Sequence, residues 1–407
     1  MSTQSGTAVI LAAGEGRRLE PLTNRRPKPM LPVGNRPLLE YVVKAVAATE
    51  IDRVVIVVGY RAERIRTHFG DGDDWGVAIE YVEQTNQLGT GHAILQAEAA
   101  ISDPFVVLNG DRIVEPELID RVRQRVHDGE TPAIAVTAVE NPRKYGVVSL
   151  AGNRVTAIDE KPEHPVETAV INAGVYGFST DIFAAIRRTE PVGELAITAT
   201  LNECAADERI TAIRYSGTWL DVSQLWDLLT VNAAVLNGGV STVDHAVPTN
   251  DNHRAETDHP TADMRTGGAT VARDALVDPT ATLGSHATIG GATAIGSNVS
   301  VGANAVVERS IIFPDAAIAP GAVVRDAVIA ANARLGPNTT VDGGASSVVV
   351  DTEIHRGVTL GGVVGDNTTI GGAATLTDAA IVGDDATVAA GVVIDGRIES
   401  GAVVRRL

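Results

Sequence analysis

A glycine-rich segment close to the start of the chain carries the most informative group of residues. Residues 11–32 read LAAGEGRRLEPLTNRRPKPMLP and directly follow an apolar run. Gly14 and Gly16 omit side chains where a backbone must approach a phosphate. Arg18 and Lys28 add donors on the same extended loop. The segment lacks both the GxxxxGK[ST] pattern of a Walker A loop and the third glycine of a dinucleotide fingerprint. It is expected to bind phosphates in another way.

Two aspartates stand where predicted strands end. Asp111 closes the run PFVVLNGD, and Asp221 closes YSGTWLD. Open α/β folds bind ligands at the carboxyl ends of their strands, and a pair of carboxylates there suits a hydrated Mg²⁺ that also takes phosphate oxygens. Each aspartate alone would also suit the N-cap of a helix. The pair is a candidate Mg²⁺ site.

Composition excludes several classes of function. The chain has 407 residues, a formal net charge of −18 and a single cysteine, Cys204. This length suffices for at least two domains. The acidic charge opposes nucleic-acid phosphates, and one cysteine excludes an intramolecular disulfide or a cysteine-based metal cluster. No run reaches the roughly 18 apolar residues of a membrane helix, so a cytoplasmic protein with no nucleic-acid or membrane partner is expected.

Lysine is rare in this acidic chain. Four lysines stand beside 29 arginines, against 51 aspartates and glutamates. Concentrated salt screens the self-repulsion of such a charge, which favours a halophilic host. An ordinary acidic protein from a GC-rich genome is the alternative.

The elements that must position these residues change character along the chain. Residues 1–236 alternate short β-branched runs with longer amphipathic stretches, which predicts a parallel sheet covered by helices on both faces. Residues 237–270 are polar, rich in Gly, Pro and Asp, and without periodicity. They are expected to form a flexible linker.

Residues 271–407 follow a different period. Aliphatic residues recur every six positions from Val277, and the phase resumes at Ile312 and Ile329. Six matches neither a helix nor a plain strand, but it matches a parallel β-helix that uses three hexapeptides per coil. Flat solenoid faces commonly stack, so a homo-oligomer, a trimer or higher, is expected. Residues 345–360 break the phase and are expected to form an excursion, in which His355 is either a catalytic base or simply solvated.

Further motifs join the first segment. They are QLGTGHA at 87–93, LNGD at 108–111, YG at 145–146, EKP at 160–162, INAG at 171–174 and WLD at 219–221. Together with residues 11–32 they resemble the nucleoside-triphosphate:sugar-1-phosphate nucleotidylyltransferases, the NDP-sugar pyrophosphorylases, with the archaeal layout that adds a C-terminal hexapeptide domain. The resemblance implies an α/β fold: a Rossmann-like, mainly parallel-sheet nucleotidyltransferase domain followed by a left-handed parallel β-helix domain.

The resemblance also implies a role for particular residues. Gln84 would read the edge of a pyrimidine base, because an amide both donates and accepts. The full set comprises Leu11, Ala13, Gly14, Gly16, Gln84, Gly89 and Thr90 for the nucleotide, Gly146, Glu160 and Asn172 for the sugar phosphate, Asp111 and Asp221 for Mg²⁺, and Arg18, Lys28 and Lys161 for catalysis.

The implied reaction joins a nucleoside triphosphate, UTP or dTTP, to a sugar 1-phosphate, with glucose 1-phosphate favoured, and releases pyrophosphate. Bifunctional relatives add an acetyltransferase in the β-helix, but Gly321 and Val324 replace the His-x-x-Tyr pair, and no lysine follows Lys161. The second domain is therefore expected to serve oligomerisation or regulation. The alternatives are a bifunctional N-acetylglucosamine-1-phosphate enzyme and a non-catalytic regulatory subunit.

Overall fold

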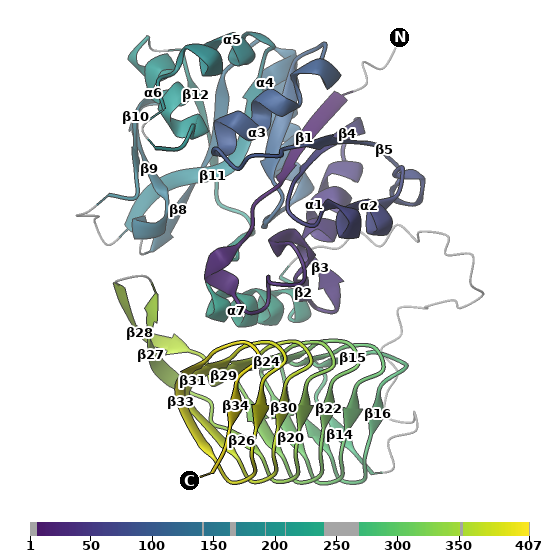
Figure 1. The fold of residues 1–407 in the computed structure, drawn as a ribbon. Helices are drawn as coiled ribbons and strands as arrows, with labels where there is room; N and C mark the ends of the chain where they lie inside the picture. The colour runs from purple at the N-terminus through teal and green to yellow at the C-terminus, as the bar shows by residue number, and fades with distance from the viewer. Residues whose placement is uncertain are drawn as a thin grey trace.

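The computed structural model describes residues 6–140, 142–162, 168–191, 193–207, 209–239, 268–350 and 353–406. Residues 6–239 build a sheet flanked by helices, and residues 268–406 build a column of short strands (Figure 1). Of the expected linker 237–270, residues 240–267 lie outside the described residues. No helix in the described ranges is long and apolar enough to cross a membrane.

Half of the nine-stranded sheet is parallel, as predicted. The strand order is β5-β4-β1-β6-β11-β8-β12-β10-β9. Its parallel part comprises β1 (Gly6–Ala12), β4 (Ile51–Val58), β5 (Ala78–Glu83) and β6 (Phe105–Asn109), with helices α1 (Leu38–Ala47), α2 (Ala62–Phe69) and α3 (Thr90–Gln96). Alternate residues of β4 enter two separate apolar clusters, so both faces of the sheet are covered.

The other half is mixed, which the sequence pattern did not predict. Strand β11 (Thr168–Phe178) runs antiparallel to β6 and to β8 (Ala133–Glu140). Its pairing with β8 shifts between Asn172 and Tyr176, at Gly174 with φ 77°. The remaining elements here are β12 (Thr211–Tyr215), β10 (Arg154–Glu160), β9 (Gly146–Ala151), α4 (Pro116–His127), α5 (Asp181–Arg188), α6 (Ile197–Ala206) and the 3-10 helices η3 (Asp73–Trp75), η4 (Glu98–Ala100) and η5 (Pro142–Lys144).

Several short elements lie outside the nine-stranded sheet. The glycine-rich residues 11–32, named the anion-binding segment or loop for their expected role, fold into 3-10 helices η1 (Arg17–Leu19) and η2 (Lys28–Met30). The pair β2 (Pro32–Val33) and β3 (Arg36–Pro37) follows. Strand β13 (Trp219–Asp221) pairs antiparallel with β7 (Arg112–Val114), and this register places Asp221 opposite Arg112. Helix α7 (Leu225–Leu236) follows and lies next to the column of short strands (Figure 1).

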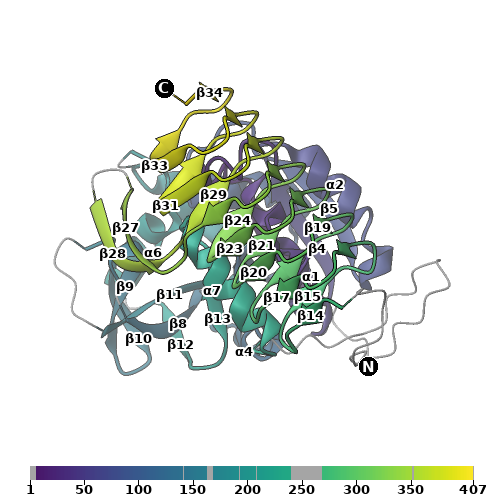
Figure 2. The ribbon, with the colours of Figure 1, turned by 90° about the horizontal axis from the view of Figure 1, so that it is seen from below.

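The hexapeptide pattern is confirmed as a parallel β-helix. Each short strand pairs in parallel with the third strand after it over the first coils, for example Val271 with Ile289, 18 residues on. Three strands therefore make one coil, and successive coils stack in a row (Figure 2). One edge-to-edge sheet contains β16 (Thr282–Leu283), β19 (Ser300–Val301), β22 (Ala317–Ile318), β25 (Arg334–Leu335), β30 (Thr369–Ile370), β32 (Thr387–Val388) and β34 (Val403–Val404).

The larger sheet of the β-helix covers its other two sides. It contains β14 (Thr270–Val271), β15 (Leu276–Val277), β17 (Thr288–Ile289), β18 (Ala294–Ile295), β20 (Val306–Glu308), β21 (Ile311–Ile312), β23 (Val323–Arg325), β24 (Ala327–Ile329), β26 (Thr340–Val341), β29 (Gly362–Val364), β31 (Thr375–Val382) and β33 (Val393–Ile398). The recurring aliphatic residues fill the interior, where Val324 is fully buried.

The excursion from the repeat is a hairpin. Strands β27 (Ala345–Val350) and β28 (Glu353–Thr359) pair antiparallel and project from the row of coils (Figure 2). His355 is half-buried, with its ring centroid 5.1 Å from that of Trp226 on α7. The His355 ring therefore lies beside α7 and is only partly exposed to solvent.

An apolar cluster joins the two parts of the chain. It includes Leu22 and Leu31 of the anion-binding segment, Leu228 of α7, and Phe313 and Val363 of the β-helix. All five side chains are at most 1% exposed. Burial of apolar surface of this kind is the main source of stability at such a contact, so the anion-binding segment is packed directly onto the β-helix.

Candidate active site

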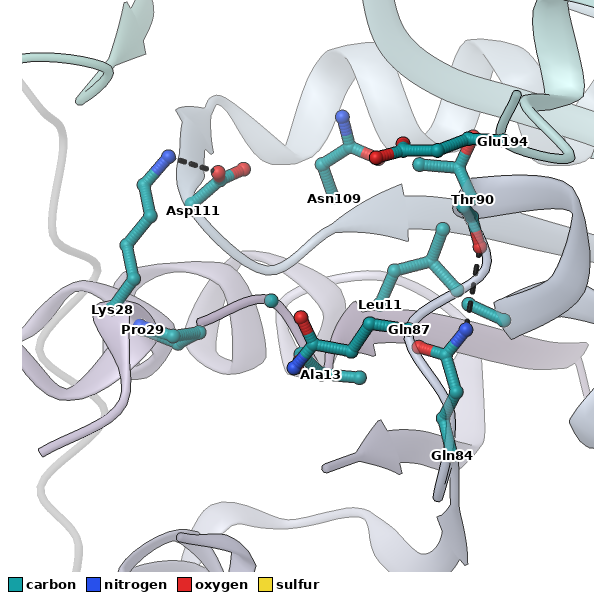
Figure 3. Close-up of a pocket in the computed structure, with 13 residues that line it drawn as sticks. Leu11, Ala13, Lys28, Pro29, Gln84, Gln87, Thr90, Asn109, Asp111 and Glu194 are labelled. Carbon is teal, nitrogen blue, oxygen red and sulfur yellow. Dashed lines mark hydrogen bonds and ion pairs between the residues drawn. The ribbon is translucent and has the colours of Figure 1, made fainter. Parts of the chain in front are cut away.

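A pocket opens at the carboxyl ends of β1 and β6. Its volume is about 270 Å³, and Figure 3 shows side chains from several separate segments pointing into it. It is lined by eight residues expected from the sequence, namely Leu11, Ala13, Gly14, Lys28, Gln84, Gly89, Thr90 and Asp111, and by Pro29, Gln87, Ala93, Asn109 and Glu194. The structure therefore brings together, in one pocket, segments that lie far apart in the sequence and that were expected to bind the phosphates and the base.

The anion-binding loop folds back on itself at Gly16. This glycine has φ 73°, and its carbonyl accepts a hydrogen bond of 3.0 Å from Thr23 Oγ1. A Cβ at Gly16 would lie 2.8 Å from Cβ of Lys28. The close approach requires glycine here and sets the position from which Lys28 extends, with its Nζ 2.5 Å from Oδ2 of Asp111 (Figure 3).

We predict that alanine destabilises the protein at Gly16 but not at Gly14 of this loop. Gly16→Ala should lower the free energy of unfolding by about 1 to 3 kcal/mol, because alanine is strained at positive φ and collides with Lys28. At Gly14 a Cβ would have no atom within 4 Å. Gly14→Ala should leave stability unchanged or raise it by up to about 1 kcal/mol. Urea unfolding of both variants measures the difference, and equal destabilisation would contradict this geometry.

Gln84, the residue expected to read the base, lines the pocket. Its side chain is buried, and Nε2 donates to the carbonyl of Gly89 at 3.3 Å and lies 2.9 Å from Nδ1 of His92. These contacts fix the amide plane. Gln87 donates from Nε2 to the carbonyl of Ala13 at 2.8 Å, which ties this segment to the end of β1.

Gly89 and Thr90 are held by a segment from much later in the chain. A Cβ on Gly89 would lie 2.6 Å from the carbonyl oxygen of Leu195, so only glycine fits. Thr90 Oγ1 accepts a hydrogen bond of 3.0 Å from the amide of Ile197. The same segment brings Glu194 to the pocket.

Asp221 is more deeply buried than Asp111. Its side chain is 4% exposed, against 25% for Asp111. Tyr145 donates to Asp221 at 3.2 Å, Ser223 also donates to it, and Nε of Arg112 lies 3.5 Å from Oδ1. Burial alone would raise the pKa of Asp221, but Arg112 and then Lys28 outweigh it and hold that pKa below its usual range.

Arg112 is a functional candidate that sequence reasoning missed. Its guanidinium lies over the rings of Tyr145 and Trp219, 5.9 and 5.5 Å from their centroids, and donates at 3.2 Å to the carbonyl of Asn172. Burial lowers the pKa of Arg112, but the carboxylates of Asp221 and Asp111 raise it by more. The net shift of this pKa is upward, so the guanidinium stays charged. Its place directly after Asp111 was the available signal.

The donor set fits a magnesium ion that arrives with phosphates. The described residues contain no group of three or more His, Cys, Asp or Glu side chains able to hold a metal. Mg²⁺ needs no such cage, because it keeps several waters and is commonly bound through one or two carboxylates and substrate phosphates. Asp111 and Asp221 supply two such carboxylates. Asp111 pairs with Lys28 and Asp221 lies beside Arg112, and each cation also interacts electrostatically with the other aspartate.

The three residues expected at the sugar phosphate come together on adjacent strands. Gly146 pairs with Glu160 in the β9–β10 ladder, and a Cβ on Gly146 would lie 2.9 Å from Oε2 of Glu160 and 3.9 Å from Cβ of Asn172. Asn172 is buried and already bonded, because Nδ2 donates to Tyr176 at 2.7 Å and Oδ1 accepts from the amide of Gly174 at 2.9 Å. It supports the bulge in β11, and Glu160 remains exposed.

Arg18 and Lys161 lie at exposed positions and do not line the pocket. The amide of Lys161 donates to the carbonyl of Tyr145 at 3.1 Å, and residues 163–167 after it lie outside the described residues. Gly16 lines an adjoining hollow together with Arg17 and Glu194. Among the missed lining residues, Gln87 and Asn109 fall inside recognised motifs, whereas Glu194 had no local signal.

Two family models match separate parts of the chain. A family model described as nucleotidyl transferase matches residues 7–238, and one described as the GMPPB C-terminal domain matches residues 271–362. The bifunctional protein GlmU of Methanococcus maripaludis is 35% identical over 247 residues, 60% of this chain and 57% of that protein. The glucose-1-phosphate thymidylyltransferase of Streptomyces antibioticus is 37% identical over 238 residues, 56% of this chain and 66% of that protein.

Among solved structures, a UDP-glucose pyrophosphorylase complexed with UDP-glucose is 27% identical with a TM-score of 0.51, covering 57% of this chain and 99% of that one. The N-terminal part has an α/β fold, and the first family model, described as nucleotidyl transferase, covers more than half of the chain. The chain belongs to the nucleotidyl transferase family, among the NDP-sugar pyrophosphorylases. It spans less than two thirds of either curated relative.

Proposed function

We propose that this chain is a sugar-1-phosphate nucleotidylyltransferase that converts UTP or dTTP and a sugar 1-phosphate, with glucose 1-phosphate favoured, to a nucleoside-diphosphate sugar and pyrophosphate. One observation carries the proposal: the anion-binding loop with Lys28, the segment of Gln84 and the carboxylate of Asp111 converge on one pocket. The proposal assigns this chemistry to residues 1–236, joined by residues 237–270 to a β-helix of residues 271–407.

The chemistry is a direct displacement. An ionised oxygen of the sugar 1-phosphate bonds to the α-phosphorus of the nucleotide, and the bond from that phosphorus to the bridging oxygen breaks. Pyrophosphate leaves with the electron pair, so little acid-base catalysis is needed. Positioning and charge stabilisation supply the rate.

The residues divide this work between the two substrates. Lys28 and Arg18 bear the triphosphate and its developing charge, with the loop of Gly14 and Gly16 around it. Lys161 neutralises the phosphate of the sugar. Lys28 Nζ is the cation that the structure already places beside Asp111 in the pocket.

The base and sugar contacts follow the two sides of the site. Gln84 presents its amide to a pyrimidine, and Leu11, Ala13, Gly89 and Thr90 border the nucleoside. Glu160 accepts hydrogen bonds from sugar hydroxyls across Gly146, and Asn172 shapes the strand beneath. Asp111 and Asp221 would hold Mg²⁺, which would supply neutralisation of the phosphate charge.

Glucose 1-phosphate is favoured because two similar proteins are named for glucose compounds, and because the β-helix departs from an acetyltransferase. Gly321 lies at a left-handed position with φ 71°, and Val324 points into the coil interior. Neither side chain supplies a base or a hydroxyl.

The β-helix is proposed to serve oligomerisation, as a trimer or higher, or regulation, in a halophilic cell.

The sugar side gives a selective prediction. Glu160→Gln should raise KM for the sugar 1-phosphate about 10-fold or more, because a hydrogen bond to a charged acceptor contributes roughly 1.5 to 3 kcal/mol. KM for the nucleotide should not change, since Glu160 lies on β10, away from the nucleotide pocket. Asp159→Asn, on the opposite face of the same strand, is the matched control. Equal effects on both substrates would contradict the assignment.

The function itself is tested by pyrophosphate release in molar KCl with Mg²⁺, crossing UTP, dTTP, CTP, GTP and ATP with glucose, N-acetylglucosamine, galactose and mannose 1-phosphates. Release with one pair would support the proposal and name the substrates. Thiol release from acetyl-CoA with an amino-sugar phosphate would instead favour the bifunctional reading. No release from the folded protein would favour a regulatory subunit.

A further inference from the structure

Three consecutive residues of the anion-binding loop each contact an aspartate of the β-helix. These three contacts, the loop clamp, are Asn24 Nδ2 to Asp384 Oδ2 at 2.8 Å, Arg25 Nη2 to Asp385 Oδ2 at 2.5 Å, and Arg26 Nη2 to both carboxylate oxygens of Asp366 at 2.8 Å. The aspartates belong to neighbouring coils, since Asp384 lies 18 residues after Asp366. A segment that helps to form the pocket is thus bound to the other part of the chain.

The Arg26–Asp366 pair is the buried member of the clamp. The side chains are 9% and 4% exposed, whereas those of Arg25 and Asp385 are 41% and 50% exposed. The guanidinium lies 5.0 Å from the ring centroid of Phe313 in the β-helix. Because a buried pair is little screened by water, it holds geometry far better than an exposed one.

Asp366 is also held by hydrogen bonds within the β-helix, independently of Arg26. Its Oδ1 accepts a hydrogen bond of 2.9 Å from the amide of Ala331, and its own amide donates to Asp384 Oδ1 at 2.7 Å. Nη1 of Arg26 is buried without a hydrogen-bond partner. The two bonds from Nη2 to the carboxylate therefore determine where the guanidinium lies.

A short, stiff connection leads from Arg26 to Lys28. Pro27 stands between them with φ −69°, and Pro29 follows inside η2. The proline ring locks φ, so the backbone has little freedom between the ion pair and the lysine. On the other side, Lys28 packs under Gly16, and Tyr60 donates at 2.6 Å to the carbonyl of Asn24.

We infer that Asp366, although it belongs to the β-helix, is a positioning residue for nucleotidyl transfer: it holds Arg26, and through Pro27 it holds Lys28 at the phosphate site. This inference rests on the proposed function. The β-helix is then a fixed part of the nucleotide-binding half of the catalytic site. Among the described residues, the hydrogen bonds and ion pairs of the clamp residues go to the loop, to Tyr60 and to the β-helix, and none goes to β9, β10 or β11.

The test uses the full-length Asp366→Asn variant. Asparagine keeps the acceptor for Ala331 but loses the charge that Arg26 faces. We expect kcat to fall about 10-fold and KM for the nucleotide to rise about 10-fold, while KM for the sugar 1-phosphate stays within 2-fold. Amides of residues 14–31 should exchange with solvent faster than in the parent protein. A general loss of folding would lower the active fraction without separating the two KM values.

Matched variants separate positioning from simple stability. Arg125→Met removes an exposed ion pair with Glu130 outside the loop and should change kcat and both KM values by less than 2-fold. The double variant Arg26→Met/Asp366→Asn leaves no unpaired buried charge, so it should recover the melting temperature lost in Asp366→Asn. Its kcat should stay low. Arg26→Lys, which keeps the charge without the planar group, should be more active than Arg26→Met.

The outcomes are distinct. Asp366→Asn with parental kcat, nucleotide KM and loop exchange would overturn the inference, and so would recovery of kcat in the double variant. If Asp366→Asn does not fold, the double variant and Arg26→Lys still decide. If the parent protein has no transferase activity, the proposed function fails, and hydrogen exchange over residues 14–31 alone shows whether Asp366 fixes the loop.

Discussion

Replacing Lys28 by alanine should lower kcat by about 100- to 1,000-fold, while the affinity for the nucleotide falls much less. Removing one preorganised donor from charge that develops in a transition state typically has an effect of this size. Lys28 is placed for this role, because its Nζ lies beside Asp111 inside the pocket and its side chain is only 16% exposed. Steady-state kinetics at saturating Mg²⁺, with separate nucleotide binding by calorimetry, measures the two effects.

Lys44→Ala is the matched control for Lys28→Ala. Lys44 lies on α1, pairs with Glu40 at 3.0 Å and lies 5.8 Å from the ring centroid of Trp75, away from the pocket. Its loss should change kcat by less than about 2-fold, since surface charge contributes little at a distance in salt. A Lys28→Ala variant with unchanged kcat would contradict the assigned role.

Asp221→Asn and Asp111→Asn should both reduce activity about 100-fold or more but differ in stability. Asp221→Asn leaves the buried Arg112 without its carboxylate, which should lower the free energy of unfolding by about 3 kcal/mol. Asp111 is more exposed, so Asp111→Asn should lower it by about 1 kcal/mol or less. Urea unfolding and the Mg²⁺ concentration for half-maximal activity are the measurements.

The contribution of Asp221 to folding stability should depend on pH. Its folded pKa lies below the ordinary value of 3.8, so its charge stabilises the fold at neutral pH, and this stabilisation is lost as the pH falls below 3.8 toward the lowered value. The stability difference between the parent and Asp221→Asn should therefore narrow in acid. The double variant Arg112→Met/Asp221→Asn should recover most of the stability but no activity. Recovery of activity would contradict a catalytic role for Asp221.

Local sequence patterns were enough to predict much of this architecture. The apolar runs at residues 7–14 and 104–111 predicted β1 and β6, and the six-residue period predicted the coils, because both depend on which neighbouring residues share a face. The reversal of β11 had no such signal. Strand direction depends on pairing between distant segments, which one sequence does not show.

Candidate site residues could be predicted from the sequence where they belong to a local motif. The loop of Gly14 and Gly16 is a local motif, so its residues were predictable together. Glu194 reaches the pocket because the amide of Leu195 bonds to the carbonyl of Leu88 at 2.7 Å, a contact between segments far apart in the chain. Asp366 is farther still, 340 positions from Arg26. Only the folded chain brings such residues together.

The most direct test of the central claim follows the phosphorus atoms. The protein is mixed with Mg²⁺, glucose 1-phosphate and UTP or dTTP, and the products are followed by ³¹P NMR. We expect a nucleoside-diphosphate sugar and pyrophosphate in equal amounts, and neither product when the sugar phosphate or Mg²⁺ is left out. Unchanged spectra from the folded protein across the sugar 1-phosphates, or orthophosphate as the product, would contradict it.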